Sequence, residues 1–235
     1  GRGNSIAMDP QQRFLLQLSC HSIENAGYSL HEFEGTRTGV YMSASPTQYK
    51  DLLEDSSFLG SVANLNAAVA GRISYLLNLH GPAMMIDTAC SSSLVAIIEA
   101  CKSIQLGLID YALAGGIRIG ASFRVKGHVN MDNVDSPGGR SRALDDDADG
   151  IGAGEGGGVV VLKSLDKAIE DKDHIHAVIK GYAINQDGGR TVGITAPSPI
   201  AQKEVITEAW EMAQVEPEAI RYIEAHGTRT ITSEF

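Results

Sequence analysis

The stretch AMMIDTACSSSLVAIIEACKSIQLG, residues 83–107, contains a strand that turns directly into a helix. Residues 83–86 are apolar, and residues 83–87 fit a short buried strand, whereas residues 91–107 repeat apolar side chains at helical steps until Gly107 ends the helix. The apolar face predicted for this helix consists of Leu94, Ile97, Ile98, Cys101 and Ile104. A strand followed by a helix in this way is typical of layered α/β proteins.

The rest of the chain alternates between the same two kinds of pattern. Strands are predicted at residues 38–45, 111–116, 158–163, 176–185 and 220–228. Helices are predicted at residues 12–27, 61–81, 164–171 and 198–215. This alternation predicts an α/β fold with helices layered on a largely buried mixed sheet.

Composition narrows the class of protein. The 235 residues are 43% apolar and 20% charged, which is typical of a globular domain. No apolar run approaches the roughly 20 residues of a membrane span, and no secretion leader opens the chain. The net charge of −10 disfavours nucleic acid and membrane surfaces as partners, although a local basic patch still allows an anionic one. Three cysteines without paired spacing indicate a reducing, cytoplasmic setting.

The two ends of the chain lack the periodicity of its middle. Residues 1–6 and 231–235 read as vector-derived residues, with natural loop ends as the alternative. On this interpretation residues 7–230 are an internal piece of a longer domain.

Three patterns resemble cofactor or metal sites but lack the required context. The glycine-rich residues 149–158 lead into a strand, whereas a dinucleotide-binding loop opens a helix. Residues 145–155 resemble a calcium loop, but Glu155 comes one position early. His174 and His176 would share a strand face without a third ligand nearby. The sequence therefore predicts no bound cofactor and no metal.

Cys90 is a candidate nucleophile because it lies where the strand turns into the helix. The positive end of a helix dipole favours a thiolate, and the small residues Ala89 and Ser91 permit a tight turn and close approach by a substrate. Cys101 lies in the middle of the helix on its apolar face, where a cysteine is usually inert core, and Cys20 belongs to the same class. The local pattern alone leaves both a nucleophile and a small core residue open for Cys90.

A cysteine nucleophile needs a partner that moves protons or stabilises charge. His226, in YIEAHGTRT, lies at the end of a predicted strand beside a glycine, where functional side chains are commonly displayed. A surface histidine is the alternative.

Taken together, these residues resemble the ketosynthase domains of bacterial modular type I polyketide synthases, which are thiolase-like condensing enzymes. DTACSSSL around Cys90 and EAHGT around His226 carry the resemblance. Further matching stretches are residues 8–16, 72–96, 114–116, 136–163 and 184–198. Within the family, GITAPS at 193–198 and DKDHIHAVIKG at 171–181 look most like synthases whose acyltransferase acts in trans.

The resemblance implies a fold, a reaction and partners. The expected fold is the thiolase-like α/β/α/β/α arrangement, present here as its N-terminal half plus a few further elements. Cys90 would carry the acyl chain as a thioester and its backbone N–H would form half of an oxyanion hole. His226 would support decarboxylation and stabilise the enolate. The implied partner is an acyl carrier protein, which brings its own phosphopantetheine arm, and the intact domain would be a homodimer.

The sequence departs from the family pattern in two respects. The family's second active-site histidine, a nearby lysine and a glycine-rich oxyanion segment follow HGT beyond the end of this chain. Arg229 stands where the family usually has glycine, and a primer-derived change is the interpretation we favour. We therefore expect the 235-residue chain alone to be inactive and its uncovered sheet face to promote aggregation.

Other functions stay open at this point. A thiolase or fatty-acid-type β-ketoacyl synthase shares the fold and the nucleophile. A non-elongating ketosynthase would transfer acyl chains without condensing them. A carrier-docking or dimer-scaffold domain is a non-enzyme alternative, which would be expected to lack the nucleophile at position 90.

Overall fold

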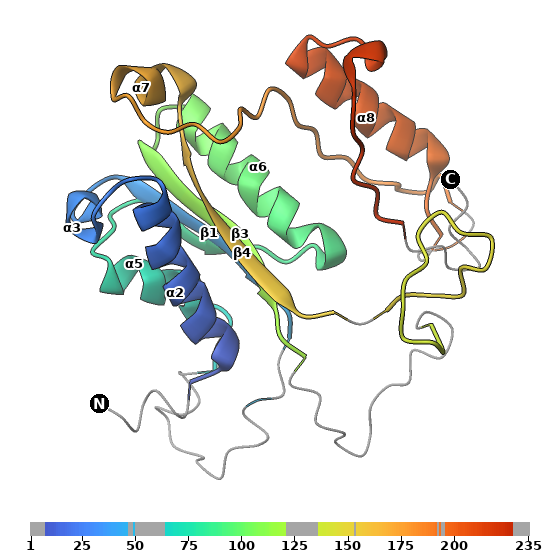
Figure 1. The fold of residues 1–235 in the computed structure, drawn as a ribbon, viewed down its shortest axis with the longest axis horizontal. Coiled ribbons are helices and arrows are strands. Elements are labelled where there is room, and N and C mark those ends of the chain that lie inside the picture. Colours follow the sequence, from blue (N-terminus) through green and yellow to red (C-terminus); the bar gives the residue numbers. More distant parts are fainter. Residues whose placement is uncertain are drawn as a thin grey trace. The chain divides into compact units, whose positions relative to one another are not determined.

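The computed structural model describes residues 8–46, 49, 64–120, 136–152, 154–191, 193 and 196–227. The chain forms two compact units. The first comprises Gly1–Phe123 and Gly154–Val178, and the second comprises Arg124–Ala153 and Ile179–Phe235. Figure 1 labels most of their helices and strands. Neither predicted vector-derived segment nor Arg229 lies among the described residues.

The elements follow the predicted alternation closely in the first unit. Its helices and strands are α2 (Pro10–Asn25), α3 (Leu30–Phe33), β1 (Thr38–Ala44), α5 (Ala68–Leu76), β2 (Ala83–Met85), the 3₁₀ turn η2 (Ala89–Ser91), α6 (Ser92–Gln105), β3 (Tyr111–Arg118), β4 (Gly156–Lys163) and α7 (Leu165–Glu170). The second unit contains α8 (Pro199–Ala213) and the 3₁₀ turn η3 (Pro217–Ala219).

The first unit is built on a four-stranded sheet with the order β2-β1-β3-β4. β1 runs parallel to both β2 and β3, whereas β4 is antiparallel to β3. Val40 of β1 lies opposite Leu113 of β3, which in turn lies opposite Val161 of β4. The predicted mixed sheet is confirmed for these four strands.

One face of the sheet packs against α2 and α5. Val40 and Met42 point to this face because alternate residues of a strand share a side, and Leu113 joins them from β3. Leu15 and Ile23 of α2 are fully buried against the same cluster. α2 begins cleanly because the Asp9 side chain accepts the Gln11 N–H at 2.7 Å and Pro10 occupies its first turn.

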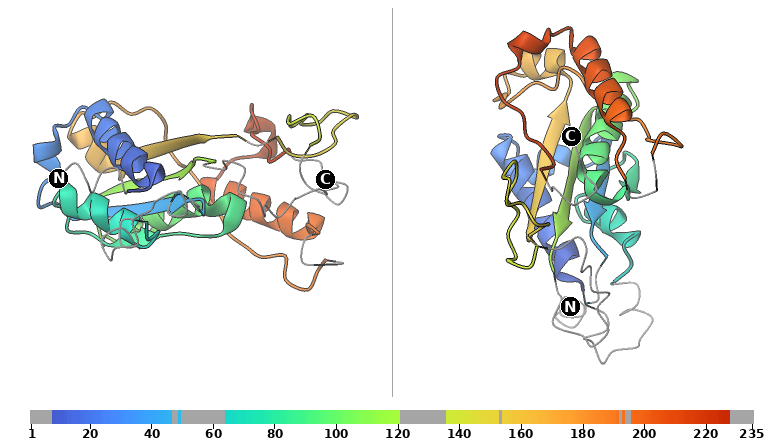
Figure 2. Two further views of the ribbon diagram at one scale, coloured as in Figure 1. Left: turned by 90° about the horizontal axis from the view of Figure 1, so that it is seen from below. Right: turned by 90° about the vertical axis from the view of Figure 1, so that its right-hand side faces the viewer.

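The opposite face of the sheet packs against α6 (Figures 1 and 2). The buried positions of α6 are Ser92, Ala96 and Ala100, and the alanines meet Ala112 and Ala114 of β3. The apolar face predicted for this helix is thus only partly correct: Ile97 and Ile104 flank the core, but Leu94 is 65% exposed. The small side chains form the contact because they let the helix approach the sheet closely.

The predicted burial of β2 is also wrong. β2 lies at the edge of the sheet, and its residues Ala83 and Met84 are exposed. The apolar residues of β2 are therefore left uncovered by the described part of the chain. No helix in the described part of the chain is long and apolar enough to cross a membrane.

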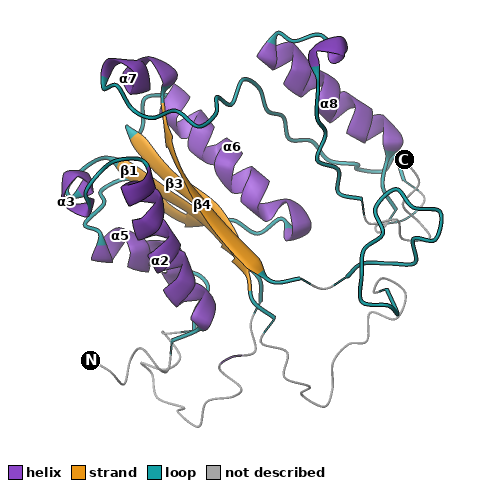
Figure 3. Ribbon diagram, in the orientation of Figure 1, coloured by secondary structure: helices purple, strands orange, loops and turns teal. Residues whose placement is uncertain are grey.

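In the second unit, α8 begins where predicted, with the Ser198 hydroxyl accepting the Ala201 N–H at 3.3 Å. The strands predicted at 176–185 and 220–228 are not observed: their described residues, up to position 227, form no strand (Figure 3). A strand needs a hydrogen-bonded neighbour, and none of the described strands supplies one. Gly181 instead packs so tightly on α8 that a Cβ there would lie 2.2 Å from the Ala209 carbonyl oxygen.

Candidate active site

Cys90 lies in the short connection between the end of β2 and the start of α6. Residues 86–88 connect β2 to the 3₁₀ turn Ala89–Ser91, and α6 follows without a break. Cys90 is exposed, so the structure does not place it in the core. The predicted strand–turn–helix position is confirmed, and it presents the thiol to solvent at the carboxyl ends of the parallel strands.

The turn that carries Cys90 has an uncommon backbone conformation. Ala89 has φ +55°, a left-handed value that costs free energy for a residue with a Cβ. The Asp87 carboxylate accepts the Ala89 N–H at 3.2 Å, and the Ser92 hydroxyl accepts the Thr88 N–H at 2.8 Å. Strained turns held by side chains are frequent at functional sites. The backbone conformation therefore indicates a functional site here, independently of the cysteine.

The other two cysteines have different surroundings. Cys20 and Cys101 are both half-buried. Burial raises the pKa of the Cys101 thiol, and burial together with the nearby Glu24 carboxylate raises that of Cys20. Both thiols are therefore kept neutral, as expected for core cysteines.

His226 belongs to the second unit, whereas Cys90 belongs to the first. The His226 side chain is exposed in an irregular segment. The next residue, Gly227, has φ +59° and lies close to residue 143, because a Cβ on it would approach the Ala143 Cβ to 2.9 Å. A compact glycine therefore lets the segment that carries His226 lie against the 136–152 loop.

The sequence patterns predict no role for Gln11, which lies beside the carboxyl ends of the central strands β1 and β3. The fully buried Gln11 amide donates to the Ser45 carbonyl at 2.8 Å and its oxygen accepts the Ile119 N–H at 3.1 Å. Ser45 and Ile119 directly follow β1 and β3, so one side chain ties together the ends of both strands. Gln11 lies just before the helix predicted at 12–27, and its one signal in the sequence is its place in the matching stretch 8–16.

Gly116 is a second residue whose role appears only in the structure. A Cβ at this position would lie 2.2 Å from the Ser43 hydroxyl oxygen and 3.1 Å from the Ser93 Cβ. Its missing side chain thus lets the first turn of α6 approach β1 and β3 closely. Gly116 therefore lies directly beneath the helix turn that follows Cys90.

At the opposite end of the sheet, Lys163 forms a polar cluster that the sequence did not predict. Its side chain is only 7% exposed and donates to Asp171 at 2.5 Å, Asp173 at 2.6 Å and the Tyr28 hydroxyl at 2.9 Å. The Lys163 ammonium also lies 5.5 Å and 5.2 Å from the ring centres of Tyr28 and Tyr111, within cation–π range.

The charges in this cluster stabilise one another. Burial disfavours the charged form of Lys163, but hydrogen bonds with Asp171, Asp173 and Tyr28 outweigh it and raise the Lys163 pKa. Hydrogen bonds from Lys163 and Lys167 lower the pKa of Asp171. Burial opposes ionisation of Asp173, but the bonds from Lys163 and Tyr28 still lower its pKa. Burial and the bond to Asp173 raise the pKa of Tyr28 to about 12.

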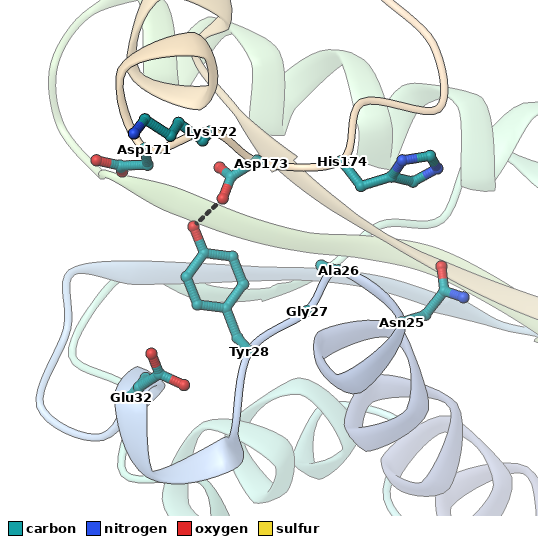
Figure 4. A pocket seen from close by; sticks show the side chains of 9 residues that line it. All are labelled: Asn25, Ala26, Gly27, Tyr28, Glu32, Asp171, Lys172, Asp173 and His174. Carbon is teal, nitrogen blue, oxygen red and sulfur yellow. Dashed lines mark hydrogen bonds between the residues drawn. The ribbon is translucent and has the colours of Figure 1, made fainter.

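A pocket of about 410 Å³ adjoins this cluster (Figure 4). It is formed by residues 25–28, Glu32 and residues 171–174. His174 and His176 stack edge to face with ring centres 4.5 Å apart. Within the described residues, no group of three or more histidine, cysteine, aspartate or glutamate side chains is placed to hold a metal ion. The pocket lies near the amino ends of the parallel strands, away from Cys90.

Two known domain families match almost the whole chain. Residues 3–168 match the N-terminal domain of β-ketoacyl synthases, and residues 176–233 match the C-terminal domain of the same enzymes.

Curated relatives are much longer than this chain. One subunit of the phenolphthiocerol/phthiocerol polyketide synthase of Mycobacterium tuberculosis is 45% identical over 231 residues, which are 97% of this chain but 15% of that protein. Polyketide synthase PksN of Bacillus subtilis is 45% identical over 233 residues, which are 95% of this chain and 4% of that protein.

Solved structures agree with these matches. The ketosynthase from module 1 of the bacillaene synthase of Bacillus amyloliquefaciens has a TM-score of 0.88 at 38% identity, covering 98% of this chain and 42% of that one. The ketosynthase from module 6 of the Bacillus subtilis bacillaene synthase has a TM-score of 0.85 at 41% identity, covering 95% and 39%. The expected thiolase-like α/β fold is thereby confirmed. The chain belongs to the β-ketoacyl synthase family and, within it, to the ketosynthases of bacterial modular polyketide synthases.

Proposed function

We propose that this chain contributes the acyl-accepting part of a ketosynthase that extends polyketide chains by decarboxylative Claisen condensation. The observation that carries the proposal is the exposed Cys90 on a strained turn at the start of a 14-residue helix, in a chain of this family. The backbone N–H of Cys90 serves as one oxyanion-hole donor.

The reaction has two covalent steps. The Cys90 thiolate attacks the carbonyl carbon of an acyl chain on its carrier protein, and the carrier thiol leaves with the proton that Cys90 gives up. A malonyl group on a carrier protein then loses carbon dioxide, which leaves an enolate. The enolate carbon attacks the Cys90 thioester, a carbon–carbon bond forms, the bond to sulfur breaks, and a β-ketoacyl carrier protein is released.

His226 supports the second step by donating a hydrogen bond to the malonyl thioester oxygen, where enolate charge develops. Its exposure at the end of an irregular segment leaves the ring accessible to a substrate. The chemistry needs neither a metal nor a diffusible cofactor, because the only prosthetic group, phosphopantetheine, belongs to the acyl carrier protein.

The working assembly is a homodimer in the cytoplasm. β2 supports dimerisation because it is an edge strand with exposed apolar residues, and Tyr75 and Leu76 of the neighbouring α5 are 84% and 54% exposed. The cytoplasmic setting is supported by the cysteines, all three of which are free.

Acyl transfer to Cys90 tests the proposal directly. The 235-residue chain is incubated with an acyl N-acetylcysteamine thioester, and the acylated peptide is identified by mass spectrometry. We expect Cys90 to be acylated at least about tenfold faster than Cys20 or Cys101, whose raised pKa values keep their thiols neutral.

The Cys90→Ala variant should lose this label, whereas Cys101→Ala should keep it. Equal labelling of the three cysteines, or labelling that survives Cys90→Ala, would contradict the assignment of the nucleophile.

Condensation requires more than this chain provides, since the chain spans about 42% of the solved ketosynthase it matches. The inactivity expected of the 235-residue chain concerns this condensation step: we expect Cys90 to accept an acyl group but no β-ketoacyl product to form when malonyl and acyl carrier proteins are added. A complete domain that transfers acyl groups but forms no such product would identify a non-elongating ketosynthase.

A further inference from the structure

The Ser92 hydroxyl bridges both sides of the turn that carries Cys90. It accepts the Thr88 N–H at 2.8 Å and donates to the Ala89 carbonyl at 2.6 Å. The Ser92 backbone N–H reaches the same carbonyl. Ser92 is 9% exposed although its neighbours Ser91 and Ser93 are exposed, so this hydroxyl is buried at the base of the turn.

These two bonds hold the 87–88 and 89–90 peptide planes, the first before Thr88 and the second directly after the strained residue Ala89. A peptide unit is planar, so a carbonyl and the N–H of the next residue turn together. Holding the Ala89 carbonyl therefore fixes the direction of the Cys90 N–H, and holding the Thr88 N–H fixes the peptide before it. The φ of +55° at Ala89 lies between the two fixed planes, where an unrestrained chain would relax toward negative φ.

We propose that Ser92 is a positioning residue that aims the Cys90 backbone N–H at the developing oxyanion. The inference rests on the proposed function, because it assigns this N–H to the oxyanion hole. Ser92 does not touch the reacting atoms and acts only through the peptide planes that it holds. Its two neighbours have other roles: Ser91 donates to the Thr88 carbonyl and hydroxyl at 2.9 Å, and the Ser93 Cβ lies over Gly116.

Acylation and alkylation of Cys90 separate this role from general damage to the fold. Attack on a thioester builds negative charge on a carbonyl oxygen, whereas attack of iodoacetamide on sulfur displaces iodide and builds none there. In the 235-residue chain, Ser92→Ala should slow acylation by N-acetylcysteamine thioesters about tenfold, less than the roughly 10²–10³-fold that follows loss of an oxyanion donor. Alkylation of Cys90 should change less than about twofold, because the thiol itself is untouched.

Matched variants sharpen the comparison. Ser92→Thr retains the hydroxyl and should restore acylation, and Ser93→Ala should leave both rates unchanged. A Ser92→Ala protein that slows both reactions equally, or neither, overturns the proposal, because equal loss indicates a structural role alone.

Amide measurements test the positioning even if Cys90 accepts no acyl group. The Thr88 N–H should exchange with deuterium about tenfold faster in Ser92→Ala than in the wild type, because its acceptor is gone. The amide resonance of Cys90 should also shift. Unchanged Thr88 exchange and an unchanged Cys90 resonance overturn the role of Ser92. A wild-type Cys90 that is alkylated but never acylated contradicts instead the proposed function.

Discussion

Lys163 shows how one buried charge is stabilised in this fold. Two aspartates and a tyrosine hydroxyl accept its three N–H groups, and two aromatic rings face it. The cluster joins the end of β4 to the start of β3 and to the segments after α2 and α7. Removing one partner of such a cluster lowers the free energy of unfolding by more than the intact cluster contributes to it, because the remaining charges stay partly buried without a partner.

Lys163→Met should lower the free energy of unfolding at pH 7 by about 3 kcal/mol, a typical cost of breaking a buried ion pair. The lowered pKa values of Asp171 and Asp173 give stability that is full above their unfolded pKa near 4 and is lost as pH falls. The variant should therefore lose less stability than the wild type between about pH 4 and pH 2.

The same cluster also predicts a loss of stability at alkaline pH. The raised pKa values of Lys163 and Tyr28 give stability that is present below about pH 10 and is lost as pH rises past it. Chemical denaturation across pH measures both losses. Lys102→Met, which removes an exposed ion pair with Glu99 on α6, is the control and should change little. Parallel pH curves for wild type and Lys163→Met would contradict this account.

Among the elements, α6 shows the limit of periodicity as a guide to packing. Its existence, its start beside Cys90 and its end before Gly107 follow from the sequence. Periodicity could not tell which side meets the sheet, because the helix carries apolar residues nearly all round. The alanine side was chosen by the small residues Ala112 and Ala114 across the contact, which only the fold brings together.

Overfilling that contact should be costly. Ala100 is fully buried, so Ala100→Leu should lower the free energy of unfolding by about 1–3 kcal/mol through displaced neighbours. The matched change Leu94→Ala, on the exposed side of the same helix, should stay within about 0.5 kcal/mol. Urea denaturation followed by circular dichroism distinguishes the two. A larger loss for Leu94→Ala would show that the other face of α6 makes the contact.

The two strands that the sequence predicted wrongly lie in the second unit, apart from residues 176–178, which belong to the first. Residues 176–185 and 220–227 have apolar strand patterns, yet they form no strand because a sheet ladder needs a partner. Cys90 and His226 could be picked from turn signals and family motifs. Ser92, Gln11 and Gly116 could not be given roles, because their partners lie far away in sequence or depend on the conformation of the turn.

At the scale of the whole molecule, exposed apolar side chains include a pair beside the β2 edge of the first unit's sheet. Met84 on β2 is 42% exposed and Tyr75 on α5 is 84% exposed. An edge strand with such side chains is a template for another strand. We therefore predict that self-association of this chain involves the β2 edge.

Met84→Lys should weaken self-association, because a charge on an edge strand opposes pairing with a second copy. We expect the apparent dissociation constant from sedimentation velocity to rise about tenfold, corresponding to about 1.4 kcal/mol. Leu108→Lys is the control, since Leu108 is 59% exposed in the connection after α6. An equal effect of both charges would show that net charge, and not the β2 edge, governs association.

The separation of the Lys163 cluster from Cys90 has a consequence for how such a protein tolerates change. The cluster lies at the amino end of β3 and Cys90 near the carboxyl ends of the parallel strands, with the eight-residue strand β3 between them. We therefore predict that substitutions around Lys163 change the folded fraction of the protein and leave the reactivity of Cys90 in each folded molecule unchanged. The amount of folded protein and the reactivity of each folded molecule can thus change independently during evolution. An engineer can adjust the first by substitutions around Lys163 without changing the second.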